Sequence, residues 1–157
     1  MRRMLKSRKA VSPVIATIII VAIAISIAIA VAYWMVGITG AFTRFEKLEI
    51  LSGYGQYIQD ESPYYNIYLT VKNTGTIDST ITLIFINGKP GTAGGIASIT
   101  YDETNAAPDD PKIPISMGKQ ITITIALNSG EFEAGQTVEV SLHTAAGRDY
   151  PKNVVLP

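Results

Sequence analysis

Residues 14–38 read VIATIIIVAIAISIAIAVAYWMVGI, an almost unbroken run of Ile, Val and Ala. The run lies within a longer stretch, from Ala10 to Thr43, in which none of the 34 residues is charged. About 20 apolar residues in a helix suffice to cross a bilayer core of about 30 Å. Buried helices of soluble proteins seldom lack polar residues over such a length. The run therefore predicts a helix that enters a membrane at some stage.

The local sequence predicts where this helix begins. Ser12 suits the N-cap, because its hydroxyl can accept a hydrogen bond from a free backbone N–H. Pro13 suits the first helical position, where no N–H is needed. The strict Ile/Ala alternation of residues 22–30 is typical of a strand, but a single strand cannot satisfy its backbone in lipid. We therefore expect a long helix from Ser12–Pro13, with Gly37 and Gly40 as places where it could bend.

Wound as a helix, this segment forms ridges of small and of bulky side chains, because residues four apart lie on one face. Small residues four apart let helix backbones approach closely. Two small ridges lie on nearly opposite sides with bulky ridges between them, which favours a helix surrounded by other helices. The alternative is an anchor that simply faces lipid. The residues expected to make helix contacts are Ile19, Ala22, Ile23, Ala24, Ser26, Ile27, Ala28, Ala30 and Ala32.

The charges sum to zero but are unevenly distributed. The 157 residues include 13 Lys and Arg and 13 Asp and Glu, and five of the basic residues lie among the first nine. The rest of the chain has eight basic and 13 acidic residues, a net charge of −5. By the positive-inside rule the basic end stays in the cytoplasm. A secretory signal peptide would have a shorter apolar core, and the acidic remainder has no basic stripe for nucleic acid.

Residues 45–157 have a different pattern, in which segments rich in Thr, Ile, Val and Tyr alternate with turns. The period-two segments 120–125 and 137–143 indicate half-buried antiparallel strands. Asn87-Gly88 predicts a tight hairpin turn, and residues 73–75 and 146–149 predict further breaks. Seven to nine short strands predict an immunoglobulin-like antiparallel sandwich, so the chain is expected to be α+β. The expected strands are 46–51, 54–58, 64–73, 78–86, 96–101, 112–116, 119–127, 136–144 and 152–156.

Residues that carry chemistry are sparse. The chain has no cysteine, which excludes disulfides, iron–sulfur clusters and thiol nucleophiles. A single histidine, His143, excludes a site with several histidine ligands. The acidic loop at residues 102–110 has oxygen ligands suited to Ca²⁺ but lacks the EF-hand spacing, and no P-loop lysine follows the glycines of residues 91–95. We therefore expect no enzyme activity, no cofactor and no bound metal.

Five of the eight tyrosines lie close together in the sequence. Tyrosine combines a large apolar area with a polar tip, which suits contact between subunits or adhesion. The plainer alternative is a set of ordinary strand residues whose hydroxyls reach solvent. The five are Tyr54, Tyr57, Tyr64, Tyr65 and Tyr68.

Residues 8–16, Arg-Lys-Ala-Val-Ser-Pro-Val-Ile-Ala, followed by the apolar run, resemble the N-terminus of archaeal type IV pilins. The resemblance implies that a basic leader, residues 1–10, is removed by a membrane prepilin peptidase. That enzyme would recognise Lys9 and Ala10 and leave Val11 as the mature N-terminus. Residues 11–44 would then form the helix that lies first in the membrane and later in a filament core, and residues 45–157 the extracellular domain.

The same resemblance implies a structural subunit of an adhesion pilus, a helical homopolymer. A cytoplasmic assembly ATPase and a membrane platform would extract the subunit from the cytoplasmic membrane into a cell-surface filament. Bacterial pilins carry a glutamate near the mature start, whereas the first acidic residue here is Glu46. Archaellins, the subunits of motility filaments, are close relatives and remain an alternative. Two others are a monomeric membrane-anchored binding domain and an extracellular β-sandwich enzyme.

Overall fold

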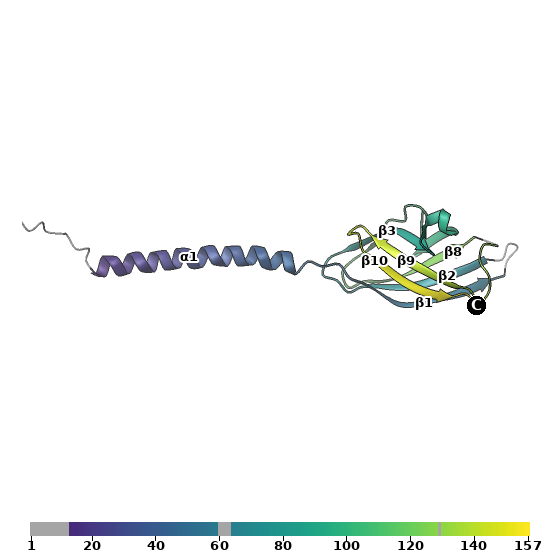
Figure 1. Ribbon diagram of the computed structural model, residues 1–157. Helices are drawn as coiled ribbons and strands as arrows, with labels where there is room; N and C mark the ends of the chain where they lie inside the picture. Colours follow the sequence, from purple (N-terminus) through teal and green to yellow (C-terminus); the bar gives the residue numbers. More distant parts are fainter. Residues whose placement is uncertain (1–12, 60–63, 129) are drawn as a thin grey trace, which may run out of the picture. The chain divides into compact units, whose positions relative to one another are not determined.

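The computed structural model describes residues 13–59, 64–128 and 130–157 (Figure 1). The chain divides between Thr43 and Arg44 into two compact units. Within the described residues, the first unit holds the helix α1 (Pro13–Phe42), and the second holds ten strands in two antiparallel sheets. The predicted α+β class, with an N-terminal apolar helix followed by an antiparallel β-sandwich, is confirmed.

Helix α1 runs for 30 residues, about 45 Å at 1.5 Å per residue. Pro13 is its first described residue, and Ser12 lies outside the described residues. The helix passes through Gly37 and Gly40 without a break and ends at Phe42. Neither glycine has another heavy atom within 4 Å of where a Cβ would stand. Within the described residues, therefore, no packing contact requires glycine at these two positions.

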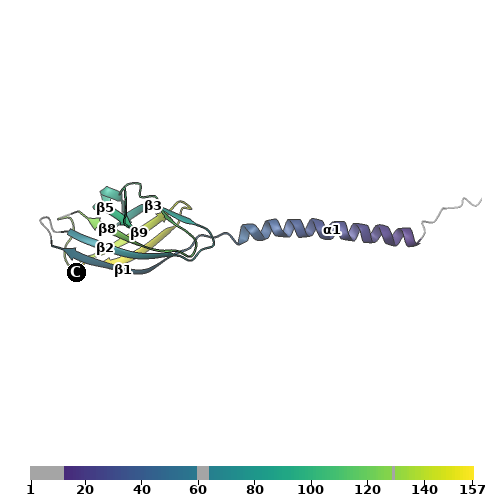
Figure 2. The same ribbon diagram turned by 180° about the vertical axis from the view of Figure 1, so that it is seen from behind.

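The first sheet has five strands, and its longer strands are labelled in Figure 1 and Figure 2. Its long central strands alternate buried residues with half-buried or exposed ones, as strands with one covered face do. In order across the sheet the strands are β1 (Leu48–Ile58), β2 (Tyr64–Asn73), β8 (Gln120–Leu127), β5 (Ile96–Tyr101) and β6 (Thr104–Ala106).

The second sheet packs against the first. The strands of this second sheet, in order, are β10 (Asp149–Val155), β9 (Thr137–Thr144), β3 (Ser79–Ile86) and β4 (Lys89–Pro90), and β7 (Ile113–Ile115) also pairs with β3. A short 3-10 helix, η1 (Gly91–Gly94), precedes β5. The core lies between the sheets. It is formed by inward residues such as Ile67, Ile123 and Leu142, which are fully buried. Burial of each such side chain stabilises the fold by about 1.5–3 kcal/mol relative to leaving it exposed.

The strands differ from the predicted ones where a turn signal was misread. The predicted segments 46–51 and 54–58 fall largely in one strand, β1, which begins at Leu48 and whose register with β2 shifts between Ile50 and Ser52. The Ser-Gly pair there is part of a bulged strand rather than a turn. Strand β10 begins at Asp149, earlier than the predicted residue 152. The strands β4 and β6 were not predicted, because two or three residues are too few to show alternation.

The hairpin predicted at Asn87-Gly88 is confirmed. Ile86 pairs with Lys89, so the loop between them has two residues. Both loop residues have positive φ, 50° for Asn87 and 78° for Gly88. Two positive φ values are required by the type I′ turn, which Asn-Gly favours.

Strands β1 and β10, the edge strands of opposite sheets, lie side by side (Figure 1). A Cβ at Gly53 would lie 3.2 Å from Val154 Cγ2, and one at Gly55 would lie 3.1 Å from the Val155 carbonyl oxygen. These distances are tighter than ordinary van der Waals contacts. A Cβ at either position would push its neighbour by a few tenths of an ångström, so glycine favours the close approach of the two strands on this side of the sandwich.

Candidate functional site: the exposed helix

Helix α1 exposes its apolar side chains all round within its own unit. Bulky residues on nearly opposite sides, such as Ile18 and Ile20, are 62% and 65% exposed. The stretch Pro13–Gly40 is long and apolar enough to cross a membrane by length and composition. Helices that are apolar on all sides are found inside membranes or inside protein cores. The surface of α1 is therefore one that lipid or protein must cover.

The Thr and Ser hydroxyls of α1 are satisfied by its own backbone. Thr17 Oγ1 donates to the Val14 carbonyl oxygen, Ser26 Oγ to that of Ala22 and Thr39 Oγ1 to that of Met35, each at 2.8 Å. An unpaired hydroxyl in an apolar environment would cost free energy. Because these donors already have acceptors, the helix can exchange a lipid environment for a protein one without leaving them unsatisfied.

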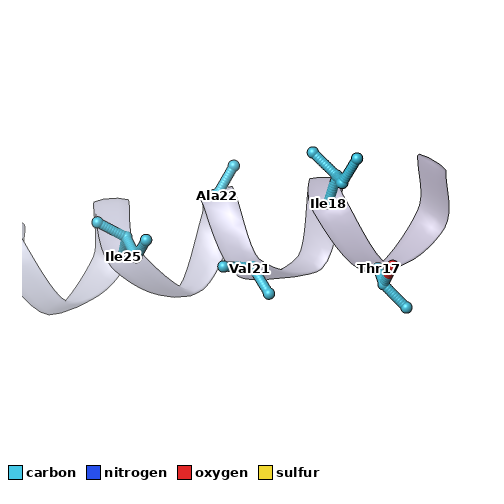
Figure 3. A pocket seen from close by; sticks show the side chains of 5 residues that line it. All are labelled: Thr17, Ile18, Val21, Ala22 and Ile25. Atoms are coloured by element: carbon cyan, nitrogen blue, oxygen red, sulfur yellow. The ribbon is translucent and has the colours of Figure 1, made fainter. Parts of the chain in front are cut away.

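A shallow hollow of about 350 Å³ lies on one face of α1 (Figure 3). Its wall includes Ile18, Val21, Ala22 and Ile25, at positions i, i+3, i+4 and i+7, with Thr17 beside them. Ile18 and Ile25 extend from the same side of the helix as the short Ala22 side chain between them (Figure 3). Four residues at this spacing form the hole that receives a side chain from a neighbouring helix in knobs-into-holes packing.

The predicted contact residues all lie on α1, and all are exposed within the helical unit. Their contacts with another helix stay a prediction, since a single chain is described. The residues predicted for leader cleavage, Lys9, Ala10 and Val11, and the predicted cap residue Ser12 lie outside the described residues. Pro13, predicted as the first helical residue, is in α1.

The first residues of the β unit are held by a buried glutamate that sequence analysis did not single out. Glu46 is buried, with only 4% of its surface exposed. Ser79 Oγ donates a hydrogen bond to its Oε1, and Thr144 Oγ1 donates one of 3.0 Å to its Oε2. A buried carboxylate needs such donors, because burial removes its water. Glu46 thus joins the start of the unit to β3 and β9.

The turn after β2 holds the same segment through its backbone. The amide nitrogens of Thr74 and Gly75 donate to the Lys47 carbonyl oxygen at 2.8 and 3.0 Å, and that of Thr76 donates to Phe45 at 2.9 Å. A Cβ at Gly75 would lie 2.6 Å from Lys47 N and from the Phe45 carbonyl oxygen. Only glycine fits here. The break predicted at residues 73–75 is therefore also the place where the backbone of the β unit hydrogen-bonds to its own first residues.

The buried side chain of Asn73 shapes this turn. Its Nδ2 donates to the carbonyl oxygens of Ile77 and Ile115 at 2.8 and 2.9 Å, and its Oδ1 accepts a 2.9 Å bond from the amide of Gly75. Asn73 is 0% exposed. The side chain therefore replaces backbone partners that the turn cannot supply.

The five clustered tyrosines divide between the two faces of the β1–β2 pair. Tyr54 pairs with Tyr68, and their rings stack with centroids 5.1 Å apart. Tyr68 alternates with buried residues of β2, so this pair is on the outer face. Tyr57 pairs with Tyr65 at 5.2 Å, and Tyr65 packs against the core. A single tyrosine surface does not form, because neighbouring strand residues point to opposite faces.

His143 has a partner that sequence analysis missed. The β9–β10 register places it opposite Asp149, with Nδ1 and Oδ1 2.7 Å apart. With Ser141 and Phe85 the pair lines a shallow hollow of about 460 Å³ on the outer face. Among the hydrogen bonds of the described residues, none joins Ser141 to His143. Asp149 was expected in a turn, and only the hairpin register could have paired it with His143.

The acidic loop uses its oxygens within the protein. Asp109 Oδ1 accepts bonds from the amide and the hydroxyl of Thr92 at 2.9 and 3.0 Å. Asp110 lies 2.7 Å from Lys112 Nζ, and this hydrogen-bonded ion pair raises the pKa of Lys112. Within the described ranges, no three His, Asp or Glu side chains are grouped to hold a metal ion.

No protein-family model and no curated protein matches the chain. Solved structures do resemble it. The archaellum periplasmic stator protein FlaG from Sulfolobus acidocaldarius has a TM-score of 0.46 and 17% identity, over 69% of this chain and 99% of that chain. The archaeal flagellum of Methanospirillum hungatei has a TM-score of 0.47 and 20% identity, over 93% of this chain and 94% of that chain. Similarities of this size carry no functional inference.

Proposed function

We propose that the chain is the structural subunit of an archaeal type IV adhesion pilus. In this proposal the leader of residues 1–10 is removed, and α1 leaves the cytoplasmic membrane to become part of a filament core. The β-sandwich is displayed outside the cell. The partners are further copies of the chain, with a prepilin peptidase, an assembly ATPase and a membrane platform acting during biogenesis. The role is assembly and involves no catalysis or cofactor.

The observation that carries this proposal is the surface of α1. It is apolar on all sides, and its Thr and Ser hydroxyls are bonded to its own backbone. Such a helix is stable in lipid and equally stable among copies of itself. Since lipid tails are as apolar as Ile, the step from lipid to filament gains little from the hydrophobic effect. Close packing must supply the preference, and the hole around Ala22 is suited to it.

The resemblance of residues 8–16 to archaeal pilin leaders is the second support. It accounts for the order of basic residues, small residue, Ser-Pro and apolar run. A monomeric anchored domain would need the length of the apolar run but would have no need for this order. The alternative of an archaellin has the same architecture, so biological readouts must separate it from a pilin.

The first test is the N-terminus of the native protein in a filament preparation from the source cells. Mass spectrometry should show a chain that begins at Val11. A full-length chain that begins at Met1 and stays in the membrane fraction would count against both filament functions. A matched pair of variants checks the processing step. Ala10→Gly should be cleaved, and Ala10→Leu should accumulate as precursor.

The second test separates the two kinds of filament. A deletion strain should lose a class of surface filaments and its adhesion while it keeps its swimming. Complementation with the intact gene should restore both. Loss of swimming with retained adhesion would contradict the pilus function and favour an archaellin.

A further inference from the structure

Two aromatic side chains lie together in the last third of α1. Tyr33 is 80% exposed and Trp34 is 66% exposed, and Trp34 is the single tryptophan of the chain. The helix before them, Pro13–Ala32, contains no aromatic residue. Tyrosine and tryptophan are enriched at the two surfaces of a bilayer, where an apolar ring and a polar tip are both accommodated. The pair therefore has the chemistry of an interfacial anchor.

Charge alone leaves the depth of α1 in a membrane unspecified. The 34 uncharged residues from Ala10 to Thr43 would span about 51 Å as a helix. The hydrocarbon core is about 30 Å thick, so the helix could slide by about 20 Å without burying a charge. A second determinant is needed to fix its position.

The distance from Pro13 to the aromatic pair matches the thickness of the hydrocarbon core. Tyr33 follows Pro13 by 20 residues, which is about 30 Å along the helix axis. Pro13 itself lies just after the basic residues of the N-terminus, which favour the cytoplasmic surface. When the basic end is at one surface of the bilayer, Tyr33 and Trp34 reach the other.

We propose that Tyr33 and Trp34 anchor α1 in the outer polar-headgroup layer of a lipid bilayer, so that Pro13–Ala32 fills the hydrocarbon core. Residues 35–42 then emerge on the outer side. The inference rests on the membrane stage of the proposed function. It adds the depth of the helix and the residues that set it, and it divides α1 into a lipid-embedded part and an emergent part.

A register in which Phe42 takes the outer surface is less favourable. It would move Tyr33 and Trp34 about 14 Å into the hydrocarbon core. The phenol and indole polar groups would then lie in lipid, where an unpaired polar group is costly. It would also expel residues 13–21, with their six Ile and Val side chains, on the inner side. The proposed register instead expels residues 35–42, which include Gly37, Thr39 and Gly40.

Because Trp34 is the only tryptophan, its fluorescence measures this depth directly. The full-length chain is incorporated into vesicles of phosphatidylcholine and phosphatidylglycerol that carry a spin-label quencher either near the headgroup or near the end of the acyl chain. We expect the shallow label to quench Trp34 more strongly than the deep label. The matched control combines Trp34→Phe with Ile23→Trp, which moves the indole about 16 Å deeper. In that variant the order of quenching should reverse.

Accessibility gives a second readout, because the chain has no native cysteine. On intact cells, a membrane-impermeant maleimide should label Thr39→Cys, which lies about 8 Å beyond Trp34 at 1.5 Å per residue. It should not label Ala30→Cys on the other side of the pair. Equal protection of both cysteines would overturn the proposed depth.

Vesicle flotation separates the two ways in which these experiments can fail. A chain that floats with the vesicles, but whose Trp34 is quenched best by the deep label, overturns the anchor and leaves the membrane stage intact. A chain that does not float overturns the membrane stage of the proposed function, and the anchor with it.

Discussion

Thr144 Oγ1 donates a 3.0 Å hydrogen bond to Glu46 Oε2, and the two residues lie 98 positions apart in the chain. Ser79 donates to the other carboxylate oxygen of Glu46. The first residues of the β unit are thereby tied to the middle strand of one sheet and to its neighbour. If force or thermal motion acts on the segment that leads into the sandwich, this bond pair and the backbone bonds of the Thr74–Thr76 turn oppose it.

We predict that Glu46→Ala destabilises the sandwich by about 2–3 kcal/mol, because two buried hydroxyls lose their acceptor. Urea unfolding of the full chain in detergent, followed by near-ultraviolet circular dichroism, measures the effect. Glu49→Ala is the control, since the exposed side chain of Glu49 belongs to β1 only three positions after Glu46. If Glu46→Ala lowers the free energy of unfolding no more than Glu49→Ala does, the buried carboxylate does not hold the first residues of the β unit in place.

Gly75→Ala should destabilise the sandwich by about 1–3 kcal/mol, the usual cost of forcing atoms into a packed site. The new Cβ would lie 2.6 Å from two backbone atoms of the first residues of the unit, which cannot move without losing hydrogen bonds. Gly37→Ala is the matched control, because nothing lies within 4 Å of its Cβ position. The sandwich of that control should unfold at the wild-type urea concentration. Unchanged unfolding of Gly75→Ala would contradict the close approach.

What the sequence alone predicted follows from local pattern. The helix was evident from uncharged length, and the Asn87-Gly88 hairpin from the two positive φ values that its residues tolerate. Strand β8 was evident from alternation, and the predicted segment 119–127 differs from Gln120–Leu127 by one residue. Each of these signals lies within a few neighbouring residues, so no knowledge of the fold is needed to read it.

What the sequence did not predict depends on distant partners. An isolated glutamate such as Glu46 is expected at the surface, and its burial follows from hydroxyls 33 and 98 positions away. The pairing of His143 with Asp149 required the register of β9 and β10. The two-faced distribution of the tyrosines required the single bulged strand β1, where two short strands had been expected.

A substitution in the outer pair Tyr54–Tyr68 tests whether the pair contacts other subunits or only stabilises its own sheet. An aromatic cross-strand pair contributes about 0.5–1.5 kcal/mol beyond burial, so Tyr54→Ala should lower the stability of the sandwich by about 1 kcal/mol in either case. If the outer face contacts other subunits, the folded variant should also form fewer filaments, as counted by electron microscopy. Tyr57→Ala, on the inner face, is the control for stability. Normal filament numbers for a folded Tyr54→Ala would assign the pair to the sheet alone.

The ion pair between Lys47 and Glu49 makes a small part of the folding stability depend on pH. Lys47 Nζ lies 2.8 Å from Glu49 Oε1. Their hydrogen bond, and secondly their charges, lower the pKa of Glu49 and raise that of Lys47. A lowered carboxylate pKa stabilises the fold above the unfolded-state pKa, and this is lost as the pH falls through the folded-state value. A raised lysine pKa stabilises below its unfolded-state value, so both contributions are present at neutral pH.

Glu49→Gln should therefore lower the melting temperature slightly at neutral pH and leave it unchanged in strong acid, where Glu49 is protonated in both states. The effect is small, because both groups are exposed and screened by solvent. Thermal unfolding at the two pH values measures it, with Glu139→Gln as a surface control. A difference that persists in strong acid would mean that the carboxylate acts through something other than its charge.

The small residues of α1 give the most direct test of filament assembly. Ala22 lies between Ile18 and Ile25 in the hollow of the helix surface (Figure 3). Ala28 belongs to the other small ridge, formed with Ala24 and Ala32. Ala22→Phe would fill the hole, so a neighbouring helix could no longer approach closely. We expect Ala22→Phe and Ala28→Phe to insert into membranes and to be processed, but to form no filaments.

Ile20→Phe is the matched control, because it exchanges one bulky exposed residue for another and leaves both small ridges unchanged. Membrane fractionation, mass spectrometry of the N-terminus and electron microscopy of the cell surface report the three stages separately. Filaments of normal number from Ala22→Phe would mean that this hole does not receive a neighbouring side chain. Filaments lost in all three variants would contradict the special role of the small residues, because a bulky position would then be equally sensitive to substitution.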